Sequence, residues 1–329
     1  MNQLPILSII IPVYNAIAYI ESALKSVEMQ GFSEDQLEVI CVDDGSKDGS
    51  GELLDRIAER KQYIKVIHKE NGGVASARNE GLDHVRGRYY LFMDADDEFI
   101  PDCLTKLTAY MDQENADVCQ YQYTRSTEWE NILKTPITFR QDNMTILGFV
   151  WLYIFKTSKY GSLRFDEKLR YAEDIFYNHQ VFVQNPICIV TDNICYYYRD
   201  TPGSLMAQRN PAEMAGVMLR LAENLKGLAE NELYQMDPQR LEDTKKFYGR
   251  AAGYYMAYSL CAGNNEYPFH MLKEKGLWPS VKEWMLLKPK KSKSKMMKDY
   301  CVFFISFRPI WWIMQKTKIL YRFRHLLFH

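Results

Sequence analysis

The sequence predicts an α/β fold: a doubly wound, mostly parallel sheet with helices on both faces, followed by a C-terminal helical extension. Over the first hundred residues, apolar runs rich in β-branched residues alternate with helical patterns. This alternation is typical of parallel sheets with right-handed crossover helices. A polar or glycine-rich segment follows each apolar run, and residues 211–287 show helical patterns without strand alternation. We therefore expect ligands to bind beyond the carboxyl ends of the strands.

The expected elements follow one another at short intervals. Residues 7–13 (LSIIIPV) form an apolar run that suits a strand buried on both faces. Further strands are expected at 37–42, 64–68, 89–93, 116–123 and 187–198. Helices are expected at 17–29, 49–60, 74–85, 212–230 and 243–261.

Composition limits the class of protein. The chain has 329 residues, of which 47% are hydrophobic and 25% charged, close to the globular average. This excludes a disordered, collagen-like or polytopic membrane protein. Seven scattered cysteines without a CxxC pair suit a reducing compartment rather than a disulfide framework or a zinc cluster. The N-terminus has no positive flank and no small-residue cleavage site, so we expect no signal peptide.

The strongest chemical signal is the acidic segment 94–97 (DADD), which follows the apolar run YYLFM. Residues i and i+2 of a strand point to the same face, so Asp94 and Asp96 are expected to face one site. Adjacent carboxylates repel unless a cation lies between them, and Mg²⁺ takes such oxygens together with substrate phosphates. The segment predicts a metal site for a diphosphate. The alternative is a solvated turn, or the N-cap of a helix beginning near Pro101.

Asp43 and Asp44 end the second expected strand, within the segment DDGSKDG (43–49). Asp, Gly and Ser are the usual turn residues, so turn and cap chemistry explains this segment without a ligand. The functional alternative is a carboxylate that accepts a hydrogen bond from the imide or amide of a pyrimidine. One loop can serve both purposes.

Residues 71–79 (NGGVASARN) join paired glycines to a helix that carries Arg78. The glycines permit positive φ and close approach of a ligand, and the helix offers unpaired N–H groups to an anion. Arg78 adds a planar fork for a phosphate or for a carboxylate of the metal site. The spacing is neither GxxxxGK[ST] nor GxGxxG, which argues against a P-loop enzyme and a dinucleotide site.

Glu173 and Asp174 open an apolar helical segment. Acids at this position usually complement the helix dipole. The functional alternative is a general base that takes the proton of a sugar hydroxyl as the new bond forms. The six histidines show no metal-ligand spacing, and His179 is expected to be a packed helix residue.

Taken together, these segments resemble the bacterial family 2 glycosyltransferases, which have the GT-A fold. The resemblance rests on SIIIPVYN (8–15), VDDGSKDGS (42–50), NGGVASARNEGL (71–82), YYLFMDADDEF (89–99), AEDIFYN (172–178) and YYYRDTPGSL (196–205). It covers about 200 residues from the N-terminus, and the combination is highly specific. Sugar nucleotidyltransferases share the fold class but usually open with a GxGxRL loop, where this chain has PVYN (12–15).

The resemblance implies a nucleotide site and a catalytic site. The nucleotide site, usually for a UDP-sugar, would comprise Pro12, Val13, Tyr14, Asp43, Asp44, Arg78 and Asp94. Asp96, with Asp94, would hold Mg²⁺ or Mn²⁺, and Asp174 would be the catalytic base. Glu173, beside it, and Arg199 would reach the pyrophosphate or the acceptor.

The implied reaction is an in-line displacement with inversion. A sugar passes from a nucleotide diphosphate sugar to a saccharide or lipid-linked saccharide acceptor in cell-surface polysaccharide synthesis. Two alternatives are a catalytically idle module that binds a nucleotide or glycan at the membrane, and a sugar nucleotidyltransferase.

The C-terminal segment 288–329 carries eleven Lys and Arg residues and a single acid, Asp299, for a charge of +10. Because the whole chain is −1, residues 1–287 carry about −11. The apolar stretch of the tail breaks at Arg308-Pro309, too early for a spanning helix of about 20 residues. Aromatic residues mixed with Lys and Arg predict an interfacial helix on an anionic membrane surface. The alternative is a helix packed on the body. Charge without base-reading elements predicts no nucleic-acid partner.

These expectations divide the chain into a catalytic domain at 1–210, a helical extension at 211–287 and a basic aromatic tail at 288–329. Within the catalytic domain, the nucleotide half would end near residue 110 and the acceptor half would occupy 111–210. We expect a cytoplasmic enzyme that is peripheral on the inner face of the cell membrane.

Overall fold

The structure is a computed structural model that describes residues 4–125, 138–140, 146, 148–201, 210–234, 236–262 and 268–286. The chain divides into two compact units, Met1–Pro202 and Gly203–His329. The predicted boundaries near residues 110 and 210 stay predictions, and the tail at 288–329 lies outside the described residues.

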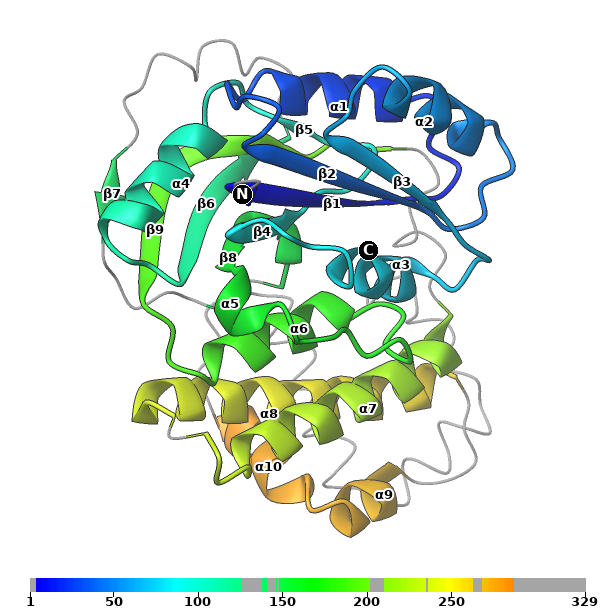
Figure 1. The fold of residues 1–329 in the computed structure, drawn as a ribbon. Coiled ribbons are helices and arrows are strands. Elements are labelled where there is room, and N and C mark those ends of the chain that lie inside the picture. The colour runs from blue at the N-terminus through cyan, green and yellow to red at the C-terminus, as the bar shows by residue number, and fades with distance from the viewer. Residues whose placement is uncertain are drawn as a thin grey trace. The chain divides into compact units, whose positions relative to one another are not determined.

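The strands of the first unit form one mixed sheet (Figure 1). In the part of the chain that the structure describes, they are β1 Leu7–Val13, β2 Leu37–Asp43, β3 Ile64–His68, β4 Tyr89–Phe92, β5 Glu98–Phe99, β6 Val118–Thr124, β7 Phe139–Arg140, β8 Tyr153–Lys156 and β9 Cys188–Tyr197. Their order is β3-β2-β1-β4-β8-β6-β9-β5, and β7 pairs with β9. Strands β1 to β4 run parallel, as predicted, whereas β8 lies antiparallel between β4 and β6.

Helices cover both faces of this sheet, as the alternation predicts. They are α1 Ile20–Glu28, α2 Ser50–Ala58, α3 Val74–Leu82, α4 Leu104–Gln113, α5 Thr157–Tyr160 and α6 Glu173–Phe182. In Figure 1, α1 and α2 lie on one side of the parallel strands and α3 lies on the other. Helix α4 begins after β5, and its N-cap is Cys103. The alternative in which the acids at 94–97 cap a helix near Pro101 is therefore wrong.

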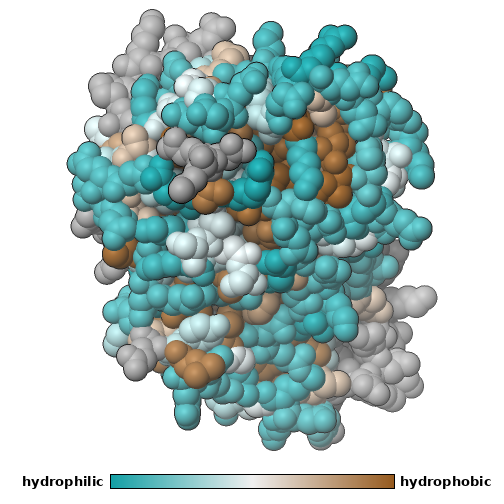
Figure 2. Space-filling view, in the orientation of Figure 1, coloured by the Kyte–Doolittle hydropathy of each residue, from teal (hydrophilic) through white to brown (hydrophobic). Residues whose placement is uncertain are grey.

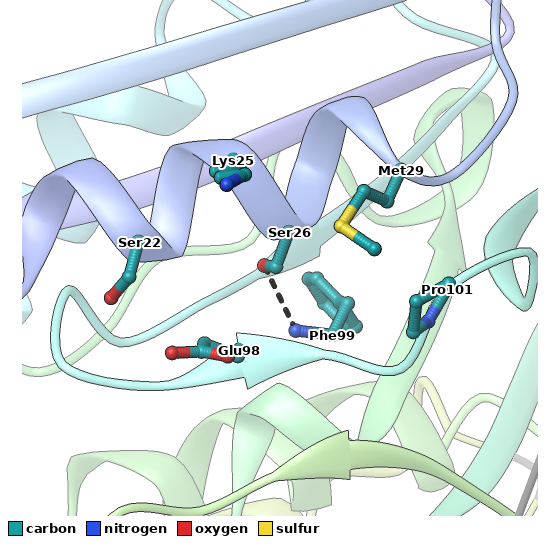
Figure 3. Close-up of a pocket in the computed structure, with 7 residues that line it drawn as sticks. All are labelled: Ser22, Lys25, Ser26, Met29, Glu98, Phe99 and Pro101. Carbon is teal, nitrogen blue, oxygen red and sulfur yellow. Dashed lines mark hydrogen bonds between the residues drawn. The ribbon is translucent and has the colours of Figure 1, made fainter. Parts of the chain in front are cut away.

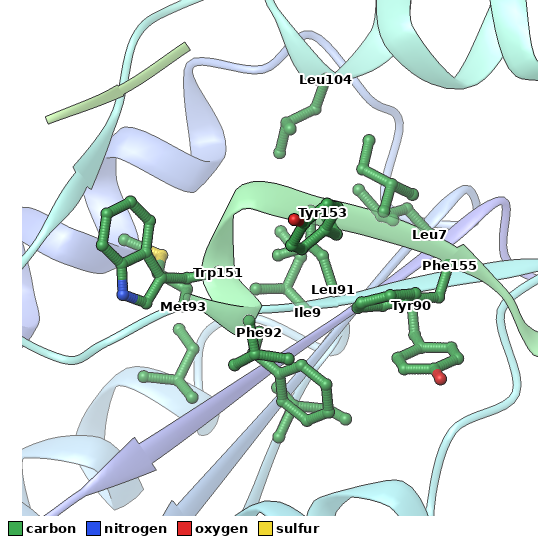
Figure 4. Close-up of a cluster of buried hydrophobic side chains, with 14 of the residues drawn as sticks. Leu7, Ile9, Tyr90, Leu91, Phe92, Met93, Leu104, Trp151, Tyr153 and Phe155 are labelled. Carbon is green, nitrogen blue, oxygen red and sulfur yellow. The ribbon is translucent and has the colours of Figure 1, made fainter. Parts of the chain in front are cut away.

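The parallel strands have an apolar interior because they are covered on both faces. Every residue of β2 is buried, as is every residue of β1 except the half-buried Pro12. Figure 4 shows Ile9 of β1 and Leu91 of β4 gathered with Tyr153 of β8. On the face drawn in Figure 2, hydrophilic side chains dominate and apolar ones form small patches. Because β1 and β2 are buried, the loops at their carboxyl ends project from a closely packed core.

A glycine sets how closely α3 approaches the sheet. A Cβ at Gly81 would collide with Cγ2 of Ile10 in β1. Without that Cβ the helix lies against the strand, so Arg78, one turn earlier in α3, is buried beneath the carboxyl end of β4. Gly81, the last glycine of the segment NGGVASARNEGL, therefore serves helix packing rather than a turn.

The described part of the second unit is helical, as the fold class predicts. Its helices are α7 Pro211–Ala229, α8 Pro238–Cys261, α9 Pro268–Glu274 and α10 Trp278–Leu286. Helix α7 starts with an N-cap and a proline: the Asn210 side chain accepts from Ala212 N at 2.9 Å, and Pro211 follows the cap. Helix α8 packs against α7 and α10. Among the described helices, none combines the length and the apolar composition that a membrane span needs.

Candidate active site

Arg78 joins carboxylates from two distant parts of the chain. Its Nη1 donates to Asp174 Oδ1 at 2.6 Å and to Glu173 Oε1 at 3.1 Å, and its Nη2 donates to Asp94 Oδ1 at 2.9 Å. The Phe165 ring centroid lies 5.5 Å from the guanidinium carbon. Only 3% of Arg78 is exposed. Of the two partners predicted for Arg78, a phosphate or a carboxylate of the metal site, the structure shows carboxylates. We call these four charged residues the Arg78 cluster.

Burial controls the protonation of the Arg78 cluster. It would lower the pKa of Arg78, but the carboxylates around the guanidinium overcome this effect and raise it. Burial raises the pKa of Glu173 to about 8, and the charge of Asp174 adds to the shift. Burial also raises the pKa of Asp174, against the opposing charge of Arg78. A carboxylate with a raised pKa accepts protons more readily than an exposed one, as a general base must.

Both oxygens of Asp174 are oriented. Oδ1 accepts from Arg78, and Oδ2 accepts the backbone N–H of Val150 at 3.1 Å. Val150 begins the short 3₁₀ helix Val150–Leu152, just before β8. Asp174 and Glu173 lie in the first turn of α6, so the helix-dipole interpretation of these acids also holds. Val150 was not predicted, because a backbone donor leaves no signal in side-chain identity.

The acids at 94–97 lie in a turn. Strand β4 ends at Phe92, and Asp97 N donates to Asp94 O at 3.2 Å. The expected strand geometry for Asp94 and Asp96 is therefore wrong, because a tight turn instead of an extended strand brings them together. Burial, followed by the charge of Asp94, raises the pKa of Asp96. The same two causes raise the pKa of Asp97 to about 8. We call residues 94–97 the acidic turn.

Residues from the end of β9 and just beyond it hold the acidic turn in place. Thr201 Oγ1 donates to Asp96 Oδ2 at 2.9 Å, and Asp94 N donates to the Tyr196 hydroxyl at 3.1 Å. Arg199 N donates to Asp97 Oδ1 at 2.8 Å. The Arg199 guanidinium donates to the Asp96 carbonyl at 2.9 Å and pairs with Glu98. In this structure Arg199 stabilises the acidic turn. Its contact with pyrophosphate or acceptor stays a prediction.

The loop after β1 is joined to the loop after β2 by short polar side chains. Ser46 Oγ accepts from Asn15 N at 3.0 Å, Asp48 Oδ2 from Ile17 N at 3.0 Å, and Ser50 Oγ from Ala16 N at 2.9 Å. Sequence reasoning missed these three roles, although the Asp-Gly-Ser turn composition was a signal. The predicted nucleotide residues of this loop differ in exposure: Val13 is fully buried, Pro12 is half-buried and Tyr14 is 54% exposed.

Asp44 joins the loop after β2 to the glycine pair, and Asp43 binds Ser46 and His68. Asp44 Oδ1 accepts from Gly72 N at 2.9 Å and its Oδ2 from Gly73 N at 2.8 Å. Asp43 Oδ1 accepts from Ser46 N at 3.0 Å, and Oδ2 lies 2.9 Å from His68 Nδ1. Burial would raise the pKa of Asp43, but hydrogen bonds from Ser46 and His68 lower it. These contacts agree with the turn interpretation. Recognition of a nucleotide base by Asp44 stays a prediction.

Two further features lie outside these groups. A hollow of about 270 Å³ lies between α1 and β5, where Ser26 Oγ accepts from Phe99 N at 3.0 Å (Figure 3). Lys25 and Glu98 contribute its charged groups, and none of the predicted site residues lines it. His179 is fully buried in α6, and burial lowers its pKa to about 3, which confirms the expectation of a packed helix residue.

Comparison with known proteins places the chain in a family. The sequence profile described as Glycosyl transferase family 2 matches residues 8–182, more than half of the chain. The chain belongs to this family. The match includes the acidic turn and every residue of the Arg78 cluster.

This family 2 chain has relatives among bacterial glycosyltransferases. The uncharacterized glycosyltransferase EpsJ of Bacillus subtilis is 33% identical over 221 residues, 62% of this chain and 63% of EpsJ. The poly(ribitol-phosphate) beta-N-acetylglucosaminyltransferase TarS of Staphylococcus aureus is 27% identical over 228 residues, 65% of this chain and 39% of TarS. The chain thus spans less than two thirds of the length of these relatives.

Solved structures support the GT-A fold of the family 2 chain. Residues 1–349 of S. aureus TarS in complex with UDP-GlcNAc match with a TM-score of 0.60 and 21% identity, over 96% of this chain and 89% of that structure. The mannosyltransferase PcManGT from Pyrobaculum calidifontis in complex with GDP-Man and Mn²⁺ matches with a TM-score of 0.54 and 18% identity, over 91% of this chain and 86% of that structure. At these identities the likeness shows the fold, and it confirms the GT-A architecture that the resemblance implied.

Proposed function

We propose that this chain is an inverting, metal-dependent glycosyltransferase that moves a sugar from a UDP-sugar to a saccharide or lipid-linked saccharide acceptor in cell-surface polysaccharide synthesis. The observation that carries the proposal is the Arg78 cluster, in which one guanidinium binds both Asp174 and Asp94. A transferase needs a base close to the residues that hold the metal ion and its diphosphate, because the acceptor loses its proton while charge develops on the leaving group.

The proposed reaction is a single displacement. The acceptor oxygen attacks the anomeric carbon, and the bond from that carbon to the diphosphate oxygen breaks. The electrons of the broken bond leave with UDP, and Asp174 takes the acceptor proton. The Val150 N–H and Arg78 hold the carboxylate of Asp174 in place. Burial raises the pKa of the neighbouring Glu173, so this side chain holds a proton more readily than an exposed glutamate does.

Mg²⁺ or Mn²⁺ fits the acidic turn. Asp94 and Asp96 supply carboxylate oxygens, the ligands that hard divalent ions prefer. Burial, followed by the charge of Asp94, raises the pKa of Asp96, and a bound cation would oppose this shift. Among the described residues no group of three or more His, Cys, Asp and Glu surrounds one point, so substrate phosphates and water would complete the coordination. When bound, the cation would neutralise the diphosphate. The presence of Mn²⁺ beside GDP-Man in PcManGT supports this choice.

The loops after β1 and β2 are the proposed binding site for the nucleotide base. Tyr14 is exposed enough to stack on a base, and Pro12 and Val13 lie just before it. Asp44 lies in the neighbouring loop, with Asp43 beside it. The UDP-GlcNAc in the TarS structure supports uridine as the base.

Nucleotide binding tests the proposal directly. We expect UDP with Mn²⁺ to raise the melting temperature of the protein, because a ligand that binds only the folded state stabilises it by about 2.7 kcal/mol at a hundredfold excess over Kd. The Mn²⁺-dependent part of the shift should be lost in Asp96→Asn and kept in Asp192→Asn, an exposed acid on β9. The proposal is contradicted if no nucleotide raises the melting temperature. It is also contradicted if Mn²⁺ has the same effect on Asp96→Asn as on the wild type.

Product analysis separates the alternatives. Release of UDP from a UDP-sugar identifies a transferase, whereas an idle module would bind the nucleotide without releasing product. A nucleotidyltransferase would release pyrophosphate from a nucleoside triphosphate.

We further propose that the catalytic domain acts at the cytoplasmic face of the membrane, held there by residues 288–329. The charge of +10 and the aromatic composition of this tail support the proposal. The full chain should cosediment with vesicles that contain phosphatidylglycerol, and less with purely zwitterionic vesicles. A chain that ends at residue 287 should stay in the supernatant. Equal cosedimentation of both chains would overturn the assignment of the tail.

A further inference from the structure

A stack of aromatic rings lies beside the proposed catalytic groups. Trp151 stacks on Tyr196, with ring centroids 4.6 Å apart and planes at 14°, and on Tyr198 at 5.5 Å and 25°. Phe149 stacks on Trp151 at 5.0 Å and 28°. Tyr123 meets the edge of Trp151 at 5.2 Å and 87°. We call these five residues the aromatic stack.

The aromatic stack contacts both sides of the proposed reaction centre. At its inner end, the Tyr196 hydroxyl accepts from the backbone N–H of Asp94 in the acidic turn. At the other end, Phe149 and Trp151 flank Val150, whose N–H binds Asp174. The backbone that carries Phe149 therefore adjoins the N–H that binds the base.

Exposure changes along the stack. Tyr196 is fully buried and Trp151 is 2% exposed, so these rings belong to the core. Tyr123 and Tyr198 are half-buried, and Phe149 is 39% exposed. The core thus extends outward as aromatic surface at the position next to the base.

Packing fixes the exposed ring in place. Phe149 follows Gly148, where a Cβ would lie 3.3 Å from Cγ1 of Ile175, the residue after Asp174. Gly148 therefore lets the segment lie against the first turn of α6, the same turn that carries the base. The hydrogen bond from Val150 N to Asp174 Oδ2 also joins the residue after Phe149 to the base.

We propose that Phe149, with Tyr123 and Tyr198 beside it, binds the apolar face of a pyranose ring of the acceptor. The inference rests on the proposed function and names the ring form of its acceptor. The face of an aromatic ring carries negative partial charge, which attracts the weakly positive C–H groups on one face of a pyranose. A flat sugar ring on Phe149 would direct an edge hydroxyl towards Asp174.

Charged groups border the aromatic surface. Arg125 lies over the Tyr198 ring at 4.8 Å and pairs with Asp200 at 3.0 Å. Such a pair offers donors and acceptors to the hydroxyls at the edge of a sugar ring. An open-chain polyol phosphate, the acceptor class in the name of TarS, has no flat C–H face. The aromatic stack therefore favours a pyranose over a polyol chain.

Saturation-transfer NMR tests this proposal without relying on catalysis. The probes are the methyl β-pyranosides of glucose, galactose and N-acetylglucosamine, with ribitol 5-phosphate as the open-chain comparison. With UDP and Mn²⁺ present, wild-type protein should saturate the C–H protons of one face of at least one pyranoside. The signal should fall about two- to tenfold in Phe149→Ala and in Phe149→Leu, which keeps apolar area but no ring. It should persist in Phe149→Tyr, which keeps the ring.

The outcomes separate this proposal from the proposed function. If wild-type protein shows no thermal shift with UDP and Mn²⁺, the proposed function fails first. If UDP binds, the aromatic proposal alone is overturned by any of three results: equal signals in wild type and Phe149→Leu, no signal from any pyranoside, or a signal only from ribitol 5-phosphate. Near-ultraviolet circular dichroism of each variant confirms that the fold persists, as expected for a side chain that is 39% exposed.

Discussion

Replacing Asp174 with Asn is expected to reduce sugar transfer by about 10²- to 10⁴-fold, the usual contribution of a general base. Asn keeps the shape of the side chain and an oxygen that can accept from Arg78 or Val150, but it cannot take the acceptor proton. The rate of UDP release in the presence of acceptor should therefore fall, while UDP binding, measured by thermal shift, persists. Turnover near that of wild type in a folded Asp174→Asn protein would refute the role of this residue.

The pH dependence of the wild type gives a second measurement of the same role. Burial raises the pKa of Asp174, so the base gains its proton at a higher pH than an exposed aspartate, whose pKa is about 4. We expect the transfer rate to fall as pH drops through this raised pKa, at a higher pH than an exposed aspartate would give. Asp192→Asn, an exposed acid on β9, is the matched control and should keep both the rate and the profile.

Replacing Arg78 with Met is expected to destabilise the protein by about 3–5 kcal/mol at pH 7, the cost of leaving buried charges without a partner. The guanidinium is 3% exposed and binds Asp94, Glu173 and Asp174. Met fills similar apolar volume but supplies no positive charge. Urea denaturation of the purified variant measures the loss of unfolding free energy.

Two comparisons make the Arg78 result specific. Arg88→Met removes an exposed pair with Asp112 and should cost less than about 1 kcal/mol. Without Arg78, the pKa values of the buried acids rise further above their unfolded values, so the folded state binds more protons than the unfolded state. The stability of Arg78→Met should therefore increase relative to wild type as pH falls towards 5. A cost in Arg78→Met no larger than in Arg88→Met would contradict the proposed balance of charges.

The parallel half of the fold was predictable because its signals are local. The runs at 7–13, 37–42 and 64–68 are apolar and β-branched, and each became a strand within one residue of the expected bounds. In β1 and β2 the apolar run is continuous because both faces of the strand are covered. Strand β8 was not predicted, because its place between β4 and β6 depends on pairing with residues tens of positions away.

In the candidate site too, local motifs were predictable and contacts between distant segments were not. The motifs named Asp94, Asp96 and Asp174 as acids beyond the sheet, but the strand geometry assumed for the first two was wrong, since a turn stabilised by contacts from Thr201 and Tyr196 holds them. For Arg78 the sequence offered a phosphate or a carboxylate of the metal site as a partner. The close approach of α3 to β1 places the guanidinium on carboxylates from the acidic turn and from α6, and its contact with a phosphate stays a prediction.

By itself, the sequence determined the α/β class, the parallel strands and the identity of the acids, because hydrophobic periodicity and turn composition depend on near neighbours in the chain. Only the tertiary structure decided that one arginine binds acids from two segments, and that a partly exposed phenylalanine precedes the residue whose N–H binds the proposed base. Those contacts join residues far apart in the chain, and their distances depend on how helices and strands pack, which no local pattern records.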